Sequence, residues 1–177
     1  MNQSDVFQVL RNERNYQLRR WGVRQPDDTM REATHSVSEF LIFMRDHYNE
    51  ATRSLTHSCI YVDTLTSLRK LVALGIACLE QHDSYDNSAV SMEDIFKTVQ
   101  WSGDFVPACQ SDLGTFLLRI KFCLDQGEKD AAYGEWRSGL ARLQEIICVG
   151  IQCFRVWGVT DRGPTILVTN ARDCQFA

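Results

Sequence analysis

The feature that most constrains the fold is a stretch of helical sequence that occurs twice in the chain. LTSLRKLVALGIACLEQ, at residues 65–81, aligns with LARLQEIICVGIQCFRV, at residues 140–156, at an offset of 75 positions. The alignment pairs Gly75 with Gly150 in the middle of each stretch. Self-similarity of this kind indicates that one supersecondary unit is used more than once. The sequence therefore predicts two copies of one helical unit.

Earlier parts of the two copies also resemble each other. SEFLIFM, at residues 38–44, aligns with GTFLLRI, at residues 114–120, and DVFQ at residues 5–8 matches DIFK at residues 94–97. A single deletion in a connecting loop reconciles these matches with the first one. We therefore divide one compact domain of 177 residues into repeat one (1–85), a degenerate repeat two (86–160) and a C-terminal tail (161–177).

Within each repeat, apolar residues recur at the spacing of an amphipathic helix. Ser4 is expected to cap the first helix, and Ser36 or Ser38 the second. A polar loop is expected at residues 127–134, and a linker at residues 83–91. The expected helices cover residues 5–21, 36–55, 62–82, 112–125 and 136–156.

The helix expected at residues 62–82 is apolar on two sides. Such a helix belongs in the middle of a bundle or across a dimer interface. A glycine inside a helix costs about 1 kcal/mol, so a close helix–helix crossing is expected at Gly75 and again at Gly150. The predicted fold is all-α, a helical bundle built from two tandem repeats of about three helices each, related by a pseudo-twofold axis.

Composition restricts the class of function. The formal net charge is -4 and the pI is about 5.5, without a basic stripe, which disfavours a nucleic-acid partner. No apolar run is long enough to span a membrane. The first residues lack the apolar core of a signal peptide, so a cytoplasmic protein is expected. The seven cysteines are odd in number and include no C-x-x-C pair, so we expect reduced, structural thiols.

Three segments of repeat one carry a family resemblance. ERNYQLRRWG at residues 13–22, VSEFLIFM at 37–44 and LRKLVALGIACLEQH at 68–82 resemble the phage-encoded MazG-like proteins. These proteins belong to the all-α nucleoside triphosphate pyrophosphohydrolase superfamily. The resemblance covers about residues 5–85. It implies a helical bundle, often completed by dimerisation, in which E-x-x-E and E-x-x-D motifs on successive helices hold Mg²⁺ while pyrophosphate is released.

Most of the carboxylates that the resemblance implies are replaced. Mg²⁺ requires hard oxygen ligands in octahedral geometry, and of these positions only Glu39 and Glu145 supply them. Lys70 and Arg142 carry the wrong sign of charge for a cation site. The sequence therefore predicts no cofactor. The motif positions fall on Glu39, Ile42, Ser67 and Lys70 in repeat one and on Thr115, Leu118, Arg142 and Glu145 in repeat two.

Five side chains, two of them at these motif positions, are candidates for ligand binding. Glu13, Gln17 and Trp21 lie one turn apart on the first helix, where they could read and stack on a base or could anchor that helix to the bundle. Lys70 and Arg142 could bind phosphate without a metal, or could simply face solvent.

Some apolar residues lie outside the apolar side of the helix that is expected to face the core, which indicates a further contact. They lie on the second helix of each repeat, and the contact could be with the other repeat, a second chain or a foreign protein. These residues are Ile42, Phe43, Leu118 and Phe122.

The function expected from the sequence is binding without catalysis. The partner would be a host protein or, second, a nucleotide-type ligand, as in a phage factor for host takeover or anti-defence. An alternative is a Mg²⁺-dependent pyrophosphohydrolase with a rearranged site, the one case in which Mg²⁺ would be needed. A third is a structural subunit that self-associates, for example as a homodimer. The rearranged site would use Glu39, Asp46, Asp63 or Glu145.

Overall fold

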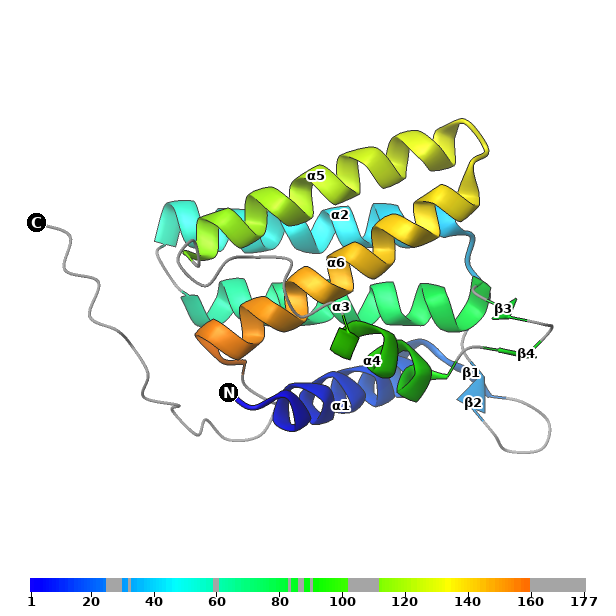
Figure 1. The fold of residues 1–177 in the computed structure, drawn as a ribbon, viewed down its shortest axis with the longest axis horizontal. Helices are drawn as coiled ribbons and strands as arrows, with labels where there is room; N and C mark the ends of the chain where they lie inside the picture. The colour runs from blue at the N-terminus through cyan, green and yellow to red at the C-terminus, as the bar shows by residue number, and fades with distance from the viewer. Residues whose placement is uncertain are drawn as a thin grey trace, which may run out of the picture.

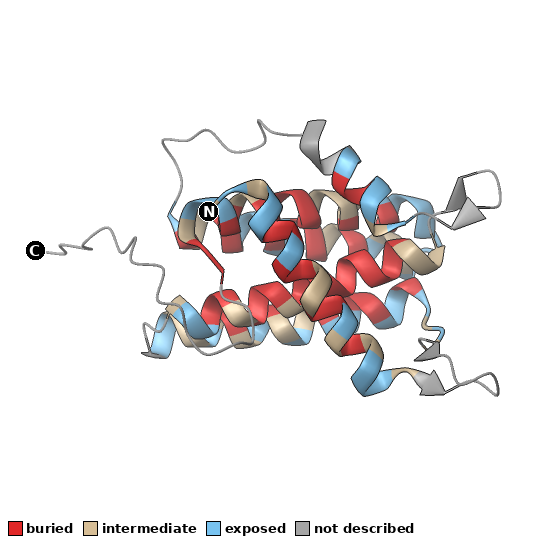
Figure 2. Cartoon of the chain, turned by 90° about the horizontal axis from the view of Figure 1, so that it is seen from below, coloured by how far each residue is buried: buried red, intermediate tan, exposed pale blue. Residues whose placement is uncertain are grey.

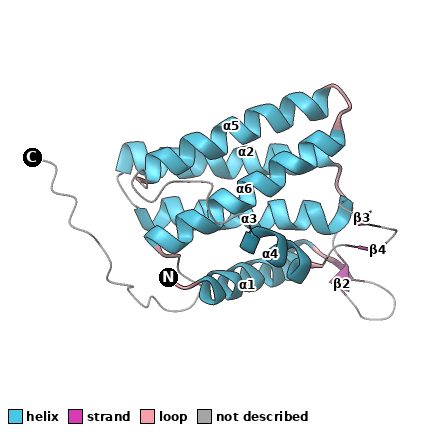
Figure 3. Ribbon diagram, in the orientation of Figure 1, coloured by secondary structure: helices cyan, strands magenta, loops and turns pink. Residues whose placement is uncertain are grey.

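The protein is an all-α bundle (Figures 1 and 3). The computed structural model describes residues 1–24, 30–31, 33–58, 61–82, 84–85, 88–89, 91–101 and 112–159, so the tail at 161–177 lies outside it. Two short antiparallel hairpins pair β1 (Val23–Arg24) with β2 (Met30–Arg31) and β3 (Ser84–Tyr85) with β4 (Ser88–Ala89). The helices are α1 (Gln3–Trp21), α2 (Val37–Arg53), the π-helix η1 (Ser54–Ser58), α3 (Tyr61–His82), α4 (Met92–Trp101), α5 (Leu113–Ala132) and α6 (Trp136–Trp157).

The residues that cap the N-termini of α1 and α2 can be compared with those expected from the sequence. At α2 the prediction of Ser36 is confirmed, because its hydroxyl accepts from the Glu39 backbone N–H while the Glu39 carboxylate accepts from the Ser36 backbone N–H. This reciprocal arrangement is a capping box. The prediction of Ser4 at α1 was wrong. The side chain of Asn2 accepts from the Asp5 backbone N–H instead, and Ser4 lies inside the first turn.

The loop predicted at residues 127–134 was mostly wrong. Helix α5 continues to Ala132, and Gly127 is buried within it. A Cβ added at Gly127 would lie 3.3 Å from Leu41 of α2 and 3.5 Å from the Cβ of Arg142 of α6. The glycine that the turn requires is Gly134, whose φ is 79°.

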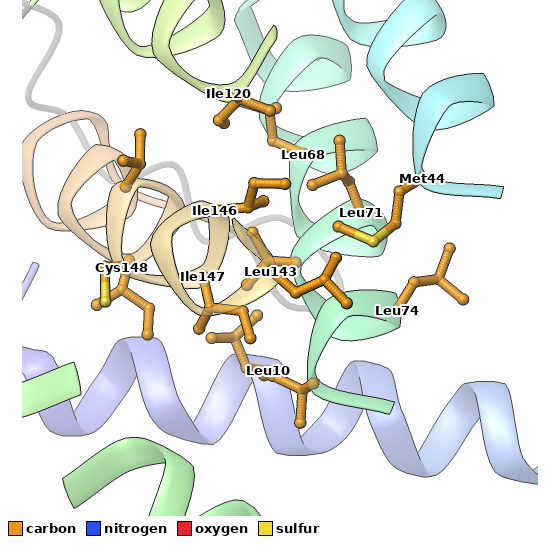
Figure 4. Packing of buried hydrophobic residues seen from close by; sticks show 14 of the residues in the cluster. Leu10, Met44, Leu68, Leu71, Leu74, Ile120, Leu143, Ile146, Ile147 and Cys148 are labelled. Atoms are coloured by element: carbon orange, nitrogen blue, oxygen red, sulfur yellow. The ribbon is translucent and has the colours of Figure 1, made fainter. Parts of the chain in front are cut away.

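Helix α3 lies at the centre of the bundle, as its two apolar sides predict. Nearly every residue from Thr64 to Leu79 is buried, and α3 contacts α1, α2, α4 and α6. The buried residues of the other helices face inward in the same way (Figure 2). Burying one Leu or Ile side chain stabilises a fold by about 1.5–3 kcal/mol. The close view in Figure 4 shows Leu68, Leu71 and Leu74 of α3 among Leu10, Met44, Ile120, Leu143, Ile146 and Ile147.

The two aligned glycines lie where α3 and α6 cross. A Cβ added at Gly150 would lie 2.3 Å from Val72 Cγ2, and one added at Gly75 would lie 3.3 Å from Ile147 Cγ1. The expected close crossing is therefore present. The two contacts are also reciprocal, because Val72 and Ile147 are themselves aligned in the repeat. A twofold relation between the whole repeats stays a prediction.

Helix pairs organise the rest of the bundle. The most extensive packing is between α5 and α6 and between α2 and α3, with α1 packed on α3. Within the part of the chain that the structure describes, no helix combines the length and the apolar character needed to cross a membrane.

Candidate functional site

The antiparallel packing of α2 and α3 determines which of the motif positions meet. Ser67 Oγ of α3 lies 3.5 Å from Glu50 Oε2 near the end of α2. Glu39 lies eleven residues earlier, about 16 Å along the helix axis, and its carboxylate is held by Ser36. The structure therefore does not bring Glu39 to Ser67 or Lys70. The residue opposite them is Glu50.

A polar pocket opens where α2, η1 and α3 meet. Its volume is about 310 Å³. We call it the α2–α3 pocket. A π-helical turn such as η1 is a rare element that often accompanies functional sites. Two cations, two carboxylates and three hydroxyl groups line the pocket, from Glu50, Arg53, Ser54, Asp63, Thr66, Ser67 and Lys70.

The charges around this pocket are only partly paired. The His47 ring nitrogen lies 3.0 Å from Glu50 Oε2, and this hydrogen bond, with smaller contributions from Lys70 and Ser67, lowers the pKa of the Glu50 carboxyl. Glu50 is therefore ionised at neutral pH. Arg53, Asp63 and Lys70 form no ion pair among the described residues. Two cationic side chains are thus open to an anionic ligand.

Sequence reasoning found only part of this pocket. It singled out Asp63, Ser67 and Lys70, all of which line it, but it did not assign Arg53 a role. The available signal was the spacing of Glu50 and Arg53, three positions apart on one helical face. That spacing alone did not show that α3 covers the same face.

Two of the first-helix candidates, Glu13 and Gln17, join α1 to α3 together with the neighbouring Arg14. Glu13 accepts from Arg69 Nε at 2.9 Å, and both side chains are almost fully buried. Arg14 donates to Glu80 at 2.7 Å. Gln17 is also buried and lies 3.4 Å from the Lys70 carbonyl oxygen. These contacts anchor α1 to the bundle.

Trp21 lies apart from that group. Its side chain is 52% exposed, and the Arg20 guanidinium lies 5.6 Å from its ring centroid. The structure therefore does not assemble Glu13, Gln17 and Trp21 into one surface. Base reading by the three together stays a hypothesis without a shared site.

Arg142 and Glu145 contact each other on α6. Arg142 Nη1 donates to Glu145 Oε1 at 2.9 Å, and Cys123 of α5 lies 3.3 Å from Glu145 Oε2. Burial, followed by the Glu145 hydrogen bond, raises the pKa of the Cys123 thiol to about 12. Burial also raises the pKa of the Cys78 thiol to about 12. Both thiols are protonated at neutral pH, so neither is an activated nucleophile.

The four acids of the enzyme alternative are spread over the bundle. Glu39 lies at the start of α2 and Asp46 is exposed in its middle, whereas Asp63 lies at the start of α3. Glu145 lies on α6 against α5. Among the described residues, no group of three or more His, Cys, Asp or Glu side chains is placed to hold a metal ion.

Large apolar side chains are exposed on α2 and α5. Leu118 is 68% exposed and Phe122 is 55% exposed on α5. On α2, Ile42 is 64% exposed, and Phe43 is 39% exposed beside the His35 ring. The prediction that these four side chains lie off the core stripe is confirmed.

Comparison with known proteins finds no matching family model, no curated protein of significant similarity and no similar solved structure.

Proposed function

We propose that this protein acts by binding another protein and not by catalysis. The observation that carries the proposal is the exposure of Leu118 and Phe122 on α5, with Ile42 also exposed on the neighbouring helix α2. Large apolar side chains grouped on a surface usually belong to an interaction site. Leu118 and Phe122 are one turn apart on α5, so they share one side of that helix. Ile42 occupies the position on α2 that aligns with Leu118.

The scaffold proposed for this role is a non-catalytic relative of the all-α pyrophosphohydrolases. The support is the sequence resemblance of repeat one together with the replacement of six of the eight acids expected over the two repeats. In this proposal the protein works in the cytoplasm, and a phage origin would make the partner a host protein.

Co-purification tests the proposal. The tagged protein should retain a stoichiometric partner from a lysate of its own cells. A variant with Ile42→Ser, Leu118→Ser and Phe122→Ser should lose that partner. The matched control is Asn49→Ser, which changes another exposed α2 position without removing an apolar side chain. Metal-dependent release of pyrophosphate from any nucleoside triphosphate would contradict a non-catalytic role.

The α2–α3 pocket favours a second candidate function, binding of a nucleotide-type ligand. Arg53 and Lys70 supply positive charge, and the hydroxyl groups of Ser54, Thr66 and Ser67 line the same 310 Å³ cavity. Guanidinium and ammonium groups bind phosphate through charge-assisted hydrogen bonds. Asp63 and Glu50 would disfavour a bare phosphate, but they could accept hydrogen bonds from a ribose or a base.

A thermal-shift panel of nucleotides, with and without Mg²⁺ or Mn²⁺, tests this second function. A ligand at 100 times its Kd stabilises a fold by about 2.7 kcal/mol, which corresponds to about 5 °C or more for a chain of this size. Arg53→Gln and Lys70→Gln should each remove the shift. Lys129→Gln on α5 should not, because Lys129 lies outside the pocket. A shift that requires metal would instead support the enzyme.

A further inference from the structure

The outer side of α5 has the pattern of a helix-binding surface. Thr115, Leu118, Phe122, Asp125 and Lys129 follow one another at intervals of three and four residues, so they form one stripe along the helix. We call this the α5 stripe. Helix α5 lies at the edge of the bundle in Figure 1, and its extensive contacts are with α6 and α2. Leu118 and Phe122, at the centre of the stripe, are mostly exposed.

The charges around the two apolar side chains are predominantly positive. Arg119 lies one turn from Phe122, and Lys129 lies two turns farther along. Both are exposed, and neither forms an ion pair among the residues that the structure describes.

The single acid of the stripe is already neutralised. Asp125 accepts from Arg45 at 2.6 Å and from Lys121 at 2.5 Å, and these two cations, with Lys121 the stronger influence, lower the pKa of its carboxyl. Arg45 also pairs with Glu128, so Arg45 and Lys121 together balance Asp125 and Glu128. The exposed Arg119 and Lys129 then leave the stripe positive, although the whole chain has a net charge of -4.

We infer that the α5 stripe binds an acidic amphipathic helix of a partner protein. Apolar side chains of that helix would pack on Leu118 and Phe122, as in other complexes in which a helix docks through its apolar face. Its carboxylates would lie beside Arg119 and Lys129, which specifies the partner through charge complementarity. This inference rests on the proposed function, because it names the kind of protein that is bound.

A second copy of the chain matches this surface less well. A symmetric dimer through the stripe would place the same patch of each chain against the other. Each copy would bring its own unpaired Arg119 and Lys129 to a surface that is already positive. An acidic helix brings the opposite charge.

Two synthetic peptides test the inference by fluorescence anisotropy. Each has three heptads, about 21 residues, with Leu at the a and d positions. One has Glu at the flanking e and g positions, and the other has Lys there. The acidic peptide should bind the full-length protein at least tenfold more tightly than the basic peptide.

Surface variants locate the binding. The double variant Leu118→Ser, Phe122→Ser should bind the acidic peptide at least tenfold more weakly. The double variant Arg119→Glu, Lys129→Glu should bind the basic peptide more tightly than the acidic one. Arg155→Glu, an exposed charge change at the far end of α6, should leave both affinities unchanged. Thermal melting followed by circular dichroism verifies that each variant folds.

The outcomes separate this inference from the proposed function. Equal affinity for both peptides, lost in the Leu118→Ser, Phe122→Ser variant, would overturn the acidic partner while leaving protein binding intact. Binding of neither peptide would overturn the helix-binding role of the stripe, and the co-purification test would still decide the proposed function. A dimer detected by light scattering and lost in the same variant would assign the stripe to a second copy instead.

Discussion

The two helix hairpins of the bundle, α2–α3 and α5–α6, have similar sequences. They differ in the connection between their helices and in the residues at the motif positions. In α2–α3, the π-helix η1 follows α2, and the pocket beside it is lined by Ser67 and Lys70. In α5–α6, a turn at Gly134 joins the helices. The residues aligned with Ser67 and Lys70 are Arg142 and Glu145, which form an ion pair on one helix. Two similar helix pairs therefore form an open polar pocket in one case and an internal ion pair in the other. The side chains, and not the helical fold, determine which function each pair can have.

The first helices of the two repeats, α1 and α4, are held to the bundle by different kinds of contact. Helix α1 is held to α3 by the nearly fully buried pair of Glu13 and Arg69. Gln144 replaces Arg69 in the aligned position of α6. Helix α4 is joined to α1 by stacking of Phe7 and Phe96, with ring centroids 4.0 Å apart, and by an ion pair at the surface. Repeat one therefore joins its first and third helices through a buried ion pair, whereas the aligned residue of repeat two, Gln144, carries no charge.

The largest expected effect comes from breaking that buried contact. Glu13→Gln removes the carboxylate that lies 2.9 Å from the buried Arg69 guanidinium. Removing one partner of a buried pair typically lowers the free energy of unfolding by about 3–5 kcal/mol. Urea denaturation followed by circular dichroism measures the change.

The matched control is Glu93→Gln, which breaks the exposed ion pair with Arg11. Exposed pairs contribute about 0–1 kcal/mol. Similar losses for Glu13→Gln and Glu93→Gln would show that the buried pair does not distinguish the two repeats. A Glu13→Leu, Arg69→Met double variant should recover most of the stability, because an apolar pair of similar volume needs no charge compensation.

The second-largest effect is expected from replacing the aligned glycines, Gly75 and Gly150, with alanine. Gly150→Ala would place a methyl group 2.3 Å from Val72, which is fully buried. Overpacking of this kind lowers the free energy of unfolding by about 1–3 kcal/mol. Gly75→Ala meets its nearest neighbours at 3.3 Å, one of them the flexible end of Met44. Its gain in helix propensity, about 1 kcal/mol, should offset that contact. Thermal and urea unfolding of both variants provide the comparison.

A double-mutant cycle shows whether the clash is the cause. Val72→Ala removes the methyl group that the new side chain would meet, so it should cost less in the Gly150→Ala background than in the wild-type protein. Additive losses would mean that Gly150 is required for another reason. The close crossing would then not explain why the repeat retains this glycine.

Local periodicity made most of the helices predictable from the sequence, whereas contacts between distant segments were not predictable. The central place of α3 follows from its two apolar sides. The end of α5 did not follow, because the stretch after Gly127 is polar and the contact of that glycine with Leu41 belongs to the tertiary fold. The α2–α3 pocket depends on the register that brings Glu50, and not Glu39, opposite Ser67. A single sequence contains no signal for that register.

The smallest expected effect concerns the ionisation of that pocket. The hydrogen bond from His47 is the main cause of the lowered pKa of Glu50. His47→Gln should therefore raise the pKa of the Glu50 carboxyl toward that of an unperturbed glutamate. NMR titration of the Glu50 side-chain carboxyl carbon measures this shift. The aligned position in α5 is Gln126, which does not titrate, so repeat two has no counterpart to this carboxyl.

The same shift determines a dependence of stability on pH. Because the pKa of Glu50 is lower in the folded than in the unfolded chain, its ionised form stabilises the fold above the unfolded pKa. That contribution is lost as the pH falls through the folded pKa. His47→Gln should therefore reduce the fall in stability over this acidic range, whereas His57→Gln, which contacts Thr56 and not Glu50, should leave it unchanged. If both variants titrate like the wild-type protein, His47 does not set the ionisation of Glu50, and the Lys70 charge and the Ser67 hydrogen bond must do so.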